Sequence, residues 1–126
     1  MSAVIDASAL LTLLLEEPGA EIVLPALRGS CMSAVNLSEC MVRAIDRGHP
    51  AQAVAEIVDA YEVTVAAFDA RQAAIASELR PQTRAVGASF GDRACLALAQ
   101  DRAIPLLTAD RRLAELDIGI DIRLIR

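Results

Sequence analysis

Four acidic residues occupy positions that a parallel α/β sheet would bring to one edge. They are Asp6, Glu39, Asp92 and Asp110. Asp6 and Asp110 each follow a short apolar run that reads as a strand, and the other two stand in the first two turns of expected helices. Because ligand sites on open parallel sheets lie outside the carboxyl ends of the strands, we expect the four side chains to converge on one rim.

Carboxylates that converge in this way repel one another. Two of them about 4 Å apart, at an effective dielectric constant near 20, repel by roughly 4 kcal/mol, so four cannot all stay ionised without a cation. Oxygen ligands favour Mg²⁺ or Mn²⁺, and such an ion can activate a water and hold a phosphate group. The sequence therefore predicts metal-dependent hydrolysis of a phosphodiester at a four-carboxylate site.

Each of these carboxylates also has a local role open to it. Asp6 and Asp110 could each cap a helix that begins at the next residue. Asp92 could complement the dipole of its helix, and Glu39 could form a surface ion pair with Arg43 four residues later. The expected placement of all four on one rim is what favours the catalytic interpretation.

The elements that must position these side chains follow from the alternation of short apolar runs with helical patterns, which is typical of α/β proteins. Strands are expected at residues 3–6, 30–33, 62–65, 105–108 and 121–125, the last at a sheet edge. Helices are expected at residues 8–17, 20–28, 34–47, 51–60, 70–80, 90–102 and 111–116, with a loop at 81–89. Right-handed crossovers then give a mostly parallel sheet in a three-layer α/β/α fold. No linker or repeat divides the sequence, so we expect residues 1–126 to form a single domain.

Composition limits the class of protein further. The chain has 126 residues, is 55% hydrophobic and carries a formal charge of -5. This composition excludes disorder, and the length is sufficient for a core without disulfides. Its cysteines, Cys31, Cys40 and Cys95, are odd in number and lack metal-binding spacing, which is typical of reduced thiols in the cytoplasm. The apolar run at 9–15 is too short to span a bilayer, so no membrane association is expected.

Four segments of the sequence carry a resemblance to a known family. They are VIDASAL at 4–10, NLSE at 36–39, FGDRACLALA at 90–99 and PLLTAD at 105–110. In order and spacing they resemble the motifs of PIN-domain nucleases, and most of all the VapC-type ribonuclease toxins of bacterial toxin-antitoxin pairs. The resemblance extends over nearly the whole chain and implies the same three-layer α/β/α fold.

This resemblance also implies roles for individual residues. Asp6 and Asp92 would be the main ligands of Mg²⁺ or Mn²⁺. Glu39 and Asp110 would complete the acidic centre, directly or through waters. Small polar side chains that would position ligands or water are Ser8, Asn36 and Thr108. For the two hydroxyl residues, local capping is an equally good interpretation.

The implied function is that of a Mg²⁺-dependent endoribonuclease that leaves 5′-phosphate and 3′-hydroxyl ends. The family further implies a homodimer and a cognate antitoxin protein that covers the site. Arginines expected near the rim are Arg80, Arg84, Arg93, Arg111 and Arg112. Guanidinium groups there could hold the RNA substrate by its phosphates without reading its sequence, although a solvated charged surface is the better interpretation for Arg80 and Arg84.

Parts of the sequence also bear on three other functions. A serine hydrolase fits the pattern Gly87-Ala88-Ser89-Phe90-Gly91, but His49 precedes the serine, so we expect Ser89 to be a helix cap. A phosphorylation-switched receiver domain would need an acidic pair after the first strand and a late lysine, and this sequence has neither. A non-catalytic interaction module, whose carboxylates only cap helices, stays open as an alternative.

Overall fold

Five short strands form one parallel sheet in the computed structural model, which describes residues 2–126. The strands are β1 (Val4–Ile5), β2 (Cys31–Ser33), β3 (Thr64–Ala66), β4 (Leu106–Thr108) and β5 (Ile122–Leu124). Their order across the sheet is β3-β2-β1-β4-β5, so β1 lies at the centre and β5 at an edge, as expected. This order differs from the 2-1-3-4-5 order of flavodoxin-like folds, which receiver domains share, and so it excludes the receiver alternative.

Helices connect every pair of consecutive strands. They are α1 (Ala7–Leu14), α2 (Ala20–Leu27), α3 (Ala34–Asp46), α4 (Ala51–Ala60), α5 (Ala70–Glu78), α6 (Arg80–Thr83), α7 (Phe90–Arg102) and α8 (Arg111–Ala114), with a 3-10 helix at Arg84–Val86. Within residues 2–126, no helix has the length and apolar character needed to cross a membrane.

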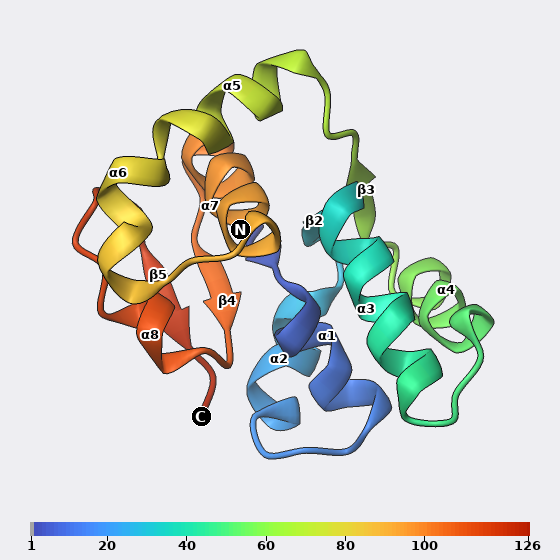
Figure 1. Ribbon diagram of the computed structural model, residues 1–126. Coiled ribbons are helices and arrows are strands. Elements are labelled where there is room, and N and C mark those ends of the chain that lie inside the picture. The colour runs from blue at the N-terminus through green and yellow to red at the C-terminus, as the bar shows by residue number, and fades with distance from the viewer. Residues whose placement is uncertain (1) are drawn as a thin grey trace.

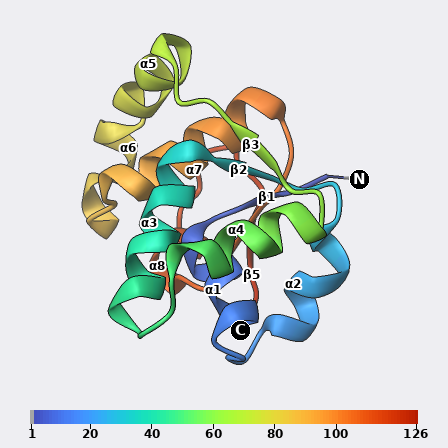
Figure 2. The same ribbon diagram turned by 90° about the vertical axis from the view of Figure 1, so that its right-hand side faces the viewer.

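The sheet is buried on both faces, which confirms the three-layer α/β/α architecture. Ile5 and Leu107 belong to one core, together with α1 to α4. Val4 and Leu106 point the other way, into a second core built with α5, α7 and α8. Figure 1 shows the two groups of helices on opposite sides of the strands, and Figure 2 views the molecule from the side of α3 and α4. Successive side chains alternate between the cores because a strand directs them to opposite faces.

Three expectations about local structure were wrong. Helix α1 ends at Leu14, three residues before the expected end at residue 17. Residues 81–89 are not simply a loop, because α6 and the 3-10 helix occupy most of the segment. Pro81 lies in the first turn of α6, where a helix needs no backbone N–H. The third strand begins two residues later than expected, because Glu62 adopts a left-handed conformation (φ 54°) that ends the preceding turn.

Candidate active site

The centre of the candidate site is Asp6, which immediately follows β1 and caps α1. Its Oδ1 accepts hydrogen bonds from the Ser8 hydroxyl (2.6 Å) and the Ala9 N–H (2.8 Å), and its Oδ2 accepts one from the Thr108 hydroxyl (2.5 Å). The residue is buried, with 6% of its surface exposed. Burial raises the pKa of Asp6 above its ordinary value, although these hydrogen bonds oppose the shift. No guanidinium pairs with it among the described residues.

Ser8 and Thr108 connect this carboxylate to the end of β4. The Ser8 Oγ accepts a hydrogen bond from the Ala109 N–H at 3.0 Å, and the Thr108 Oγ1 accepts one from the Asp110 N–H at 3.0 Å. Both hydroxyls therefore do more than cap a helix locally. They fix the chain after β4 against the chain after β1, although a hundred residues separate Ser8 from Thr108.

Glu39 lies on α3 beside the first turn of α7. Its carboxylate accepts hydrogen bonds from the Asn36 amide (3.3 Å) and from the Arg43 guanidinium (3.2 Å). Asn36 also donates to the Gly91 carbonyl at 2.9 Å, which joins α3 to α7. A Cβ atom placed on Gly91 would lie only 3.0 Å from both Glu39 carboxylate oxygens. The absence of a side chain at Gly91 is therefore what lets Glu39 approach this helix so closely.

Asp92 forms a capping box with Ser89 at the start of α7. The Asp92 Oδ2 accepts from the Ser89 N–H (2.9 Å), and the Asp92 N–H donates to the Ser89 hydroxyl (3.1 Å), so the expected cap at Ser89 is confirmed. Burial raises the pKa of the Cys95 thiol, one turn along α7, and the negative charges of Asp6, Asp92 and Glu39 raise it further. The charges of three of the four expected carboxylates therefore act on the same buried thiol.

Asp110 follows β4 and pairs with Arg112. Its carboxylate accepts the Arg112 backbone N–H (2.9 Å), and the Arg112 guanidinium forms an ion pair with it at 3.0 Å. These hydrogen bonds, the side-chain one foremost, lower the pKa of Asp110. The same guanidinium donates to the Val86 carbonyl at 3.1 Å, so Asp110 is turned toward the end of the 3-10 helix.

The expected tight cluster of all four carboxylates is not formed in the structure. Within residues 2–126, no three His, Cys, Asp or Glu side chains lie close enough together to hold a metal ion as they stand. Asp92 is engaged by Ser89, and Asp110 by Arg112. The four residues stand at the same rim, but each makes the local contact that its own position offers.

Comparison with known families identifies the family of the chain that carries this rim. Residues 3–119 match the PIN domain. The chain belongs to the PIN domain family. The match contains all four acidic residues and the segments around them, and it confirms the family resemblance that these segments carry.

Solved structures share the fold of this PIN domain over nearly its whole length. A toxin-antitoxin complex from Klebsiella pneumoniae has a TM-score of 0.79 at 18% identity, with 98% of each chain covered. A DNA-bound VapBC from Salmonella typhimurium has a TM-score of 0.75 at 18% identity, covering 100% of this chain and 99% of that one. A Sarcin-Ricin loop cleaving toxin from Mycobacterium tuberculosis has a TM-score of 0.69 at 18% identity, covering 94% and 98%. No protein with a curated description gives a significant match.

The arginines expected around the rim of this PIN domain differ in what their side chains contact and in how exposed they are. Arg93 is directed toward α5, where its guanidinium donates to the Ala76 carbonyl at 3.5 Å. Arg112 is paired with Asp110. Arg111 is exposed at the first position of α8, and Arg80 and Arg84 are exposed on α6 and the 3-10 helix.

Sequence reasoning missed two features of the PIN domain rim. One is the close approach of Glu39 to Gly91, for which the only signal was a glycine inside the first turn of an expected helix. The other is a group of arginines on the α1–α3 side, Arg43, Arg47 and Arg126. Their positions in the sequence gave no signal, because they come together only in the folded chain.

Proposed function

We propose that this PIN domain is a divalent-metal-dependent endoribonuclease that acts as the toxin of a toxin-antitoxin pair. The observation that carries the proposal is Asp6, a buried carboxylate at the shared end of two neighbouring strands, whose pKa is raised by burial and, to a smaller extent, by the negative charge of Asp92. A buried carboxylate without a cationic partner is costly, and a bound cation would remove that cost. Perturbed ionisable groups of this kind are common at functional sites.

The residues present fit Mg²⁺ or Mn²⁺ by their chemistry. All the charged donors are carboxylate oxygens, and the buried Asn36 Oδ1 has no hydrogen-bond partner in the structure. Mg²⁺ keeps several waters and is usually held by one or two carboxylates together with substrate phosphates, so three directly ligating side chains are not required. Asp6 and Asp92 would hold the ion, with Glu39 and Asp110 acting directly or through water. When bound, such an ion polarises a phosphate oxygen and makes a water more acidic.

The protein's own groups would then have separate tasks. Ser8 and Thr108 hold the Asp6 carboxylate in one orientation by donating to its two oxygens. Asn36 orients Glu39 and anchors it to α7. Arg111 is exposed near the rim, where a guanidinium group would contact the phosphates of the RNA substrate.

The solved relatives support the biological assignment. One is a Sarcin-Ricin loop cleaving toxin, and others are toxin-antitoxin complexes. We therefore propose that this chain cleaves RNA in the cytoplasm and that a cognate antitoxin protein binds it and blocks its site. We also propose that the chain forms a homodimer.

The local contacts of the acidic residues favour one alternative, a non-catalytic module. Asp6 and Asp110 are the N-caps of α1 and α8, and Asp92 completes the capping box of α7, so each carboxylate has a structural role that needs no negative charge. Asparagine is as good an N-cap as aspartate. Replacing Asp6 or Asp110 by asparagine therefore removes a charge and keeps the cap, which separates the two functions.

The decisive experiment is cleavage of total cellular RNA by the purified chain, with Mg²⁺, with Mn²⁺ and with EDTA. We expect discrete products with the two ions and none with EDTA. Asp6→Asn and Asp92→Asn should fold and be inactive, whereas Asp59→Asn, on the exposed end of α4, should cleave like the wild type. Equal cleavage by Asp6→Asn and the wild type would reject the proposal.

A further inference from the structure

A hollow lies beside the candidate site, between α1 and α3. Its volume is about 320 Å³, within the range of sites that bind small molecules. Leu11 and Leu15 of α1 form its apolar wall, and Ser8 lines it at the start of the same helix. Because the Ser8 hydroxyl donates to Asp6 at 2.6 Å, the hollow adjoins the candidate catalytic carboxylate.

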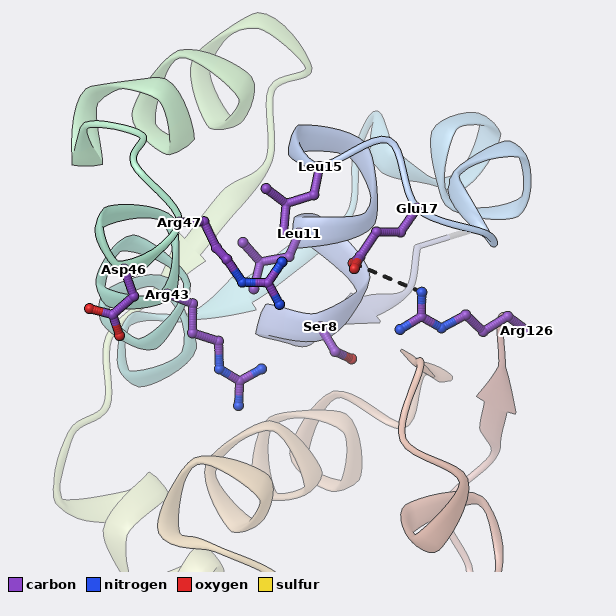
Figure 3. A pocket seen from close by; sticks show the side chains of 8 residues that line it. All are labelled: Ser8, Leu11, Leu15, Glu17, Arg43, Asp46, Arg47 and Arg126. Carbon is purple, nitrogen blue, oxygen red and sulfur yellow. Dashed lines mark ion pairs between the residues drawn. The ribbon is translucent and has the colours of Figure 1, made fainter.

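Two arginines at the carboxyl end of α3, Arg43 in its last turn and Arg47 at its C-cap, supply positive charge to this hollow. Figure 3 shows Arg43 and Arg47 extending from α3 toward Ser8, one turn apart on the same face of the helix. The Asp46 carboxylate points away from Ser8 in the same view. Both arginines are exposed, so their guanidinium groups are open to a ligand.

The ion pairs of the described residues determine which of these charges is available. Arg126 is paired with Glu17 at 3.9 Å, across the opposite wall of the hollow. Arg43 is shared with Glu39 at 3.2 Å. Arg47 has no carboxylate within 4.0 Å among residues 2–126, and it therefore carries an uncompensated charge.

The ligand that suits this arrangement is an anion that offers two acceptor oxygens to one planar guanidinium group. Guanidinium groups match phosphate in this way, and they bind it without reading a base. The chain as a whole is acidic, with a formal charge of -5, so a polyanionic strand can approach only where arginines gather locally. The hollow provides such a place, and its apolar wall would face a sugar or a base.

We propose that this hollow binds a phosphate group of the RNA strand adjacent to the one that is cut, through Arg47 and Arg43. The inference rests on the proposed ribonuclease function. It makes Arg47 a substrate-binding residue that sets where the strand lies relative to Asp6. Arg43 would connect the two regions, because it contacts Glu39 of the candidate site while lining the hollow.

The test is the affinity for a short fluorescent RNA in EDTA, so that binding is measured without cleavage. The variant is Arg47→Gln, because the backbone N–H of Arg47 caps α3 and is kept in the variant. The matched control is Arg102→Gln, an exposed arginine at the carboxyl end of α7. Circular dichroism melting of both variants verifies that they fold.

We expect Arg47→Gln to weaken RNA binding roughly tenfold, as the loss of a charged hydrogen bond would. The slope of log K against log salt should become shallower by about 0.7, which corresponds to one phosphate contact on a single strand. Arg102→Gln should change neither quantity. Unchanged affinity and slope in Arg47→Gln would overturn the proposal, and so would a wild type that does not bind the RNA.

Two further outcomes distinguish this phosphate site from the proposed ribonuclease function and from a protein-docking surface. If Arg47→Gln weakens RNA binding but the wild type cleaves no RNA with Mg²⁺, the phosphate site stands and the proposed function falls. If Arg47→Gln loses a co-expressed antitoxin protein while its RNA affinity is unchanged, the hollow is a protein-docking surface, and the inference is wrong.

Discussion

The Thr108 hydroxyl donates to the Asp6 carboxylate at 2.5 Å, across the neighbouring strands β4 and β1. Thr108 is completely buried, and its oxygen also accepts the Asp110 N–H. One side chain therefore orients a candidate catalytic carboxylate and fixes the backbone of a second acidic residue. The hydrogen bond joins residues that lie 102 positions apart in the sequence.

Thr108→Val should destabilise the protein and weaken its activity. Valine has nearly the same shape but leaves the buried Asp6 Oδ2 and the Asp110 N–H without their partner, which costs about 1–3 kcal/mol. Urea unfolding measures the loss. Thr108→Ser keeps the hydroxyl and should lose less than Thr108→Val, so equal losses in the two variants would contradict this role of the hydroxyl.

Gly91→Ala should impair RNA cleavage more than it impairs folding. Alanine favours a helix by about 1 kcal/mol over glycine, but its Cβ would lie 3.0 Å from the Glu39 carboxylate oxygens, so the partly exposed Glu39 side chain must move. We expect near wild-type unfolding in urea together with reduced cleavage.

A double-mutant cycle with Glu39→Gln tests whether Gly91→Ala acts through Glu39. In the Glu39→Gln background, Gly91→Ala should have little further effect on cleavage. A full additional loss in that background would show that the glycine matters for another reason.

Mn²⁺ should raise the melting temperature of the wild type. An ion at a hundred times its Kd stabilises the folded state by about 2.7 kcal/mol, which is roughly 10 °C for a domain of this size. Asp6→Asn should not show this shift, and Asp59→Asn should keep it.

In EDTA we expect Asp6→Asn to have a higher melting temperature than the wild type. Burial raises the pKa of Asp6, which means that its ionised form costs folding free energy near neutral pH. Asp6→Asn should therefore melt above the wild type when no metal is present. A lower melting temperature for Asp6→Asn would show that the hydrogen bonds of the carboxylate outweigh its burial.

The contact between α5 and α7 should depend on pH through Asp101. Its carboxylate accepts hydrogen bonds from the Arg71 guanidinium (2.7 Å) and the Gln72 amide (2.9 Å), and the former in particular lowers the pKa of Asp101. A carboxyl with a lowered folded pKa stabilises the protein above its unfolded pKa, and this stabilisation is lost as the pH falls through the folded pKa.

Asp101→Asn should accordingly melt below the wild type near neutral pH, and the difference should shrink as the pH falls below the ordinary pKa of an aspartate and vanish below the lowered pKa of Asp101. The matched control is Asp121→Asn, whose exposed ion pair with Arg123 should contribute little at either pH. A difference that persists in acid would assign the effect of Asp101→Asn to packing instead of charge.

Much of the fold could be predicted from the sequence because its signals are local. The bounds of α4 and α7 agree with the expected 51–60 and 90–102, since a proline or serine before each helix and its apolar spacing depend only on near neighbours. The capping interpretations of Asp6, Ser89 and Asp110 are confirmed for the same reason. The expectation of a loop at residues 81–89 was wrong because a proline is compatible both with the end of one helix and with the first turn of the next.

The order of residues along the chain was enough to indicate which residues stand at the carboxyl ends of the strands, and hence that Asp6 and Asp110 reach the same rim. The contacts that each side chain makes there became visible only in the folded protein. The approach of Glu39 to Gly91, and the gathering of Arg43 and Arg47 beside Ser8, depend on how α3 packs against α7 and α1. Such contacts join residues far apart in the chain, and their geometry is set by the packing of whole helices, which no local pattern encodes.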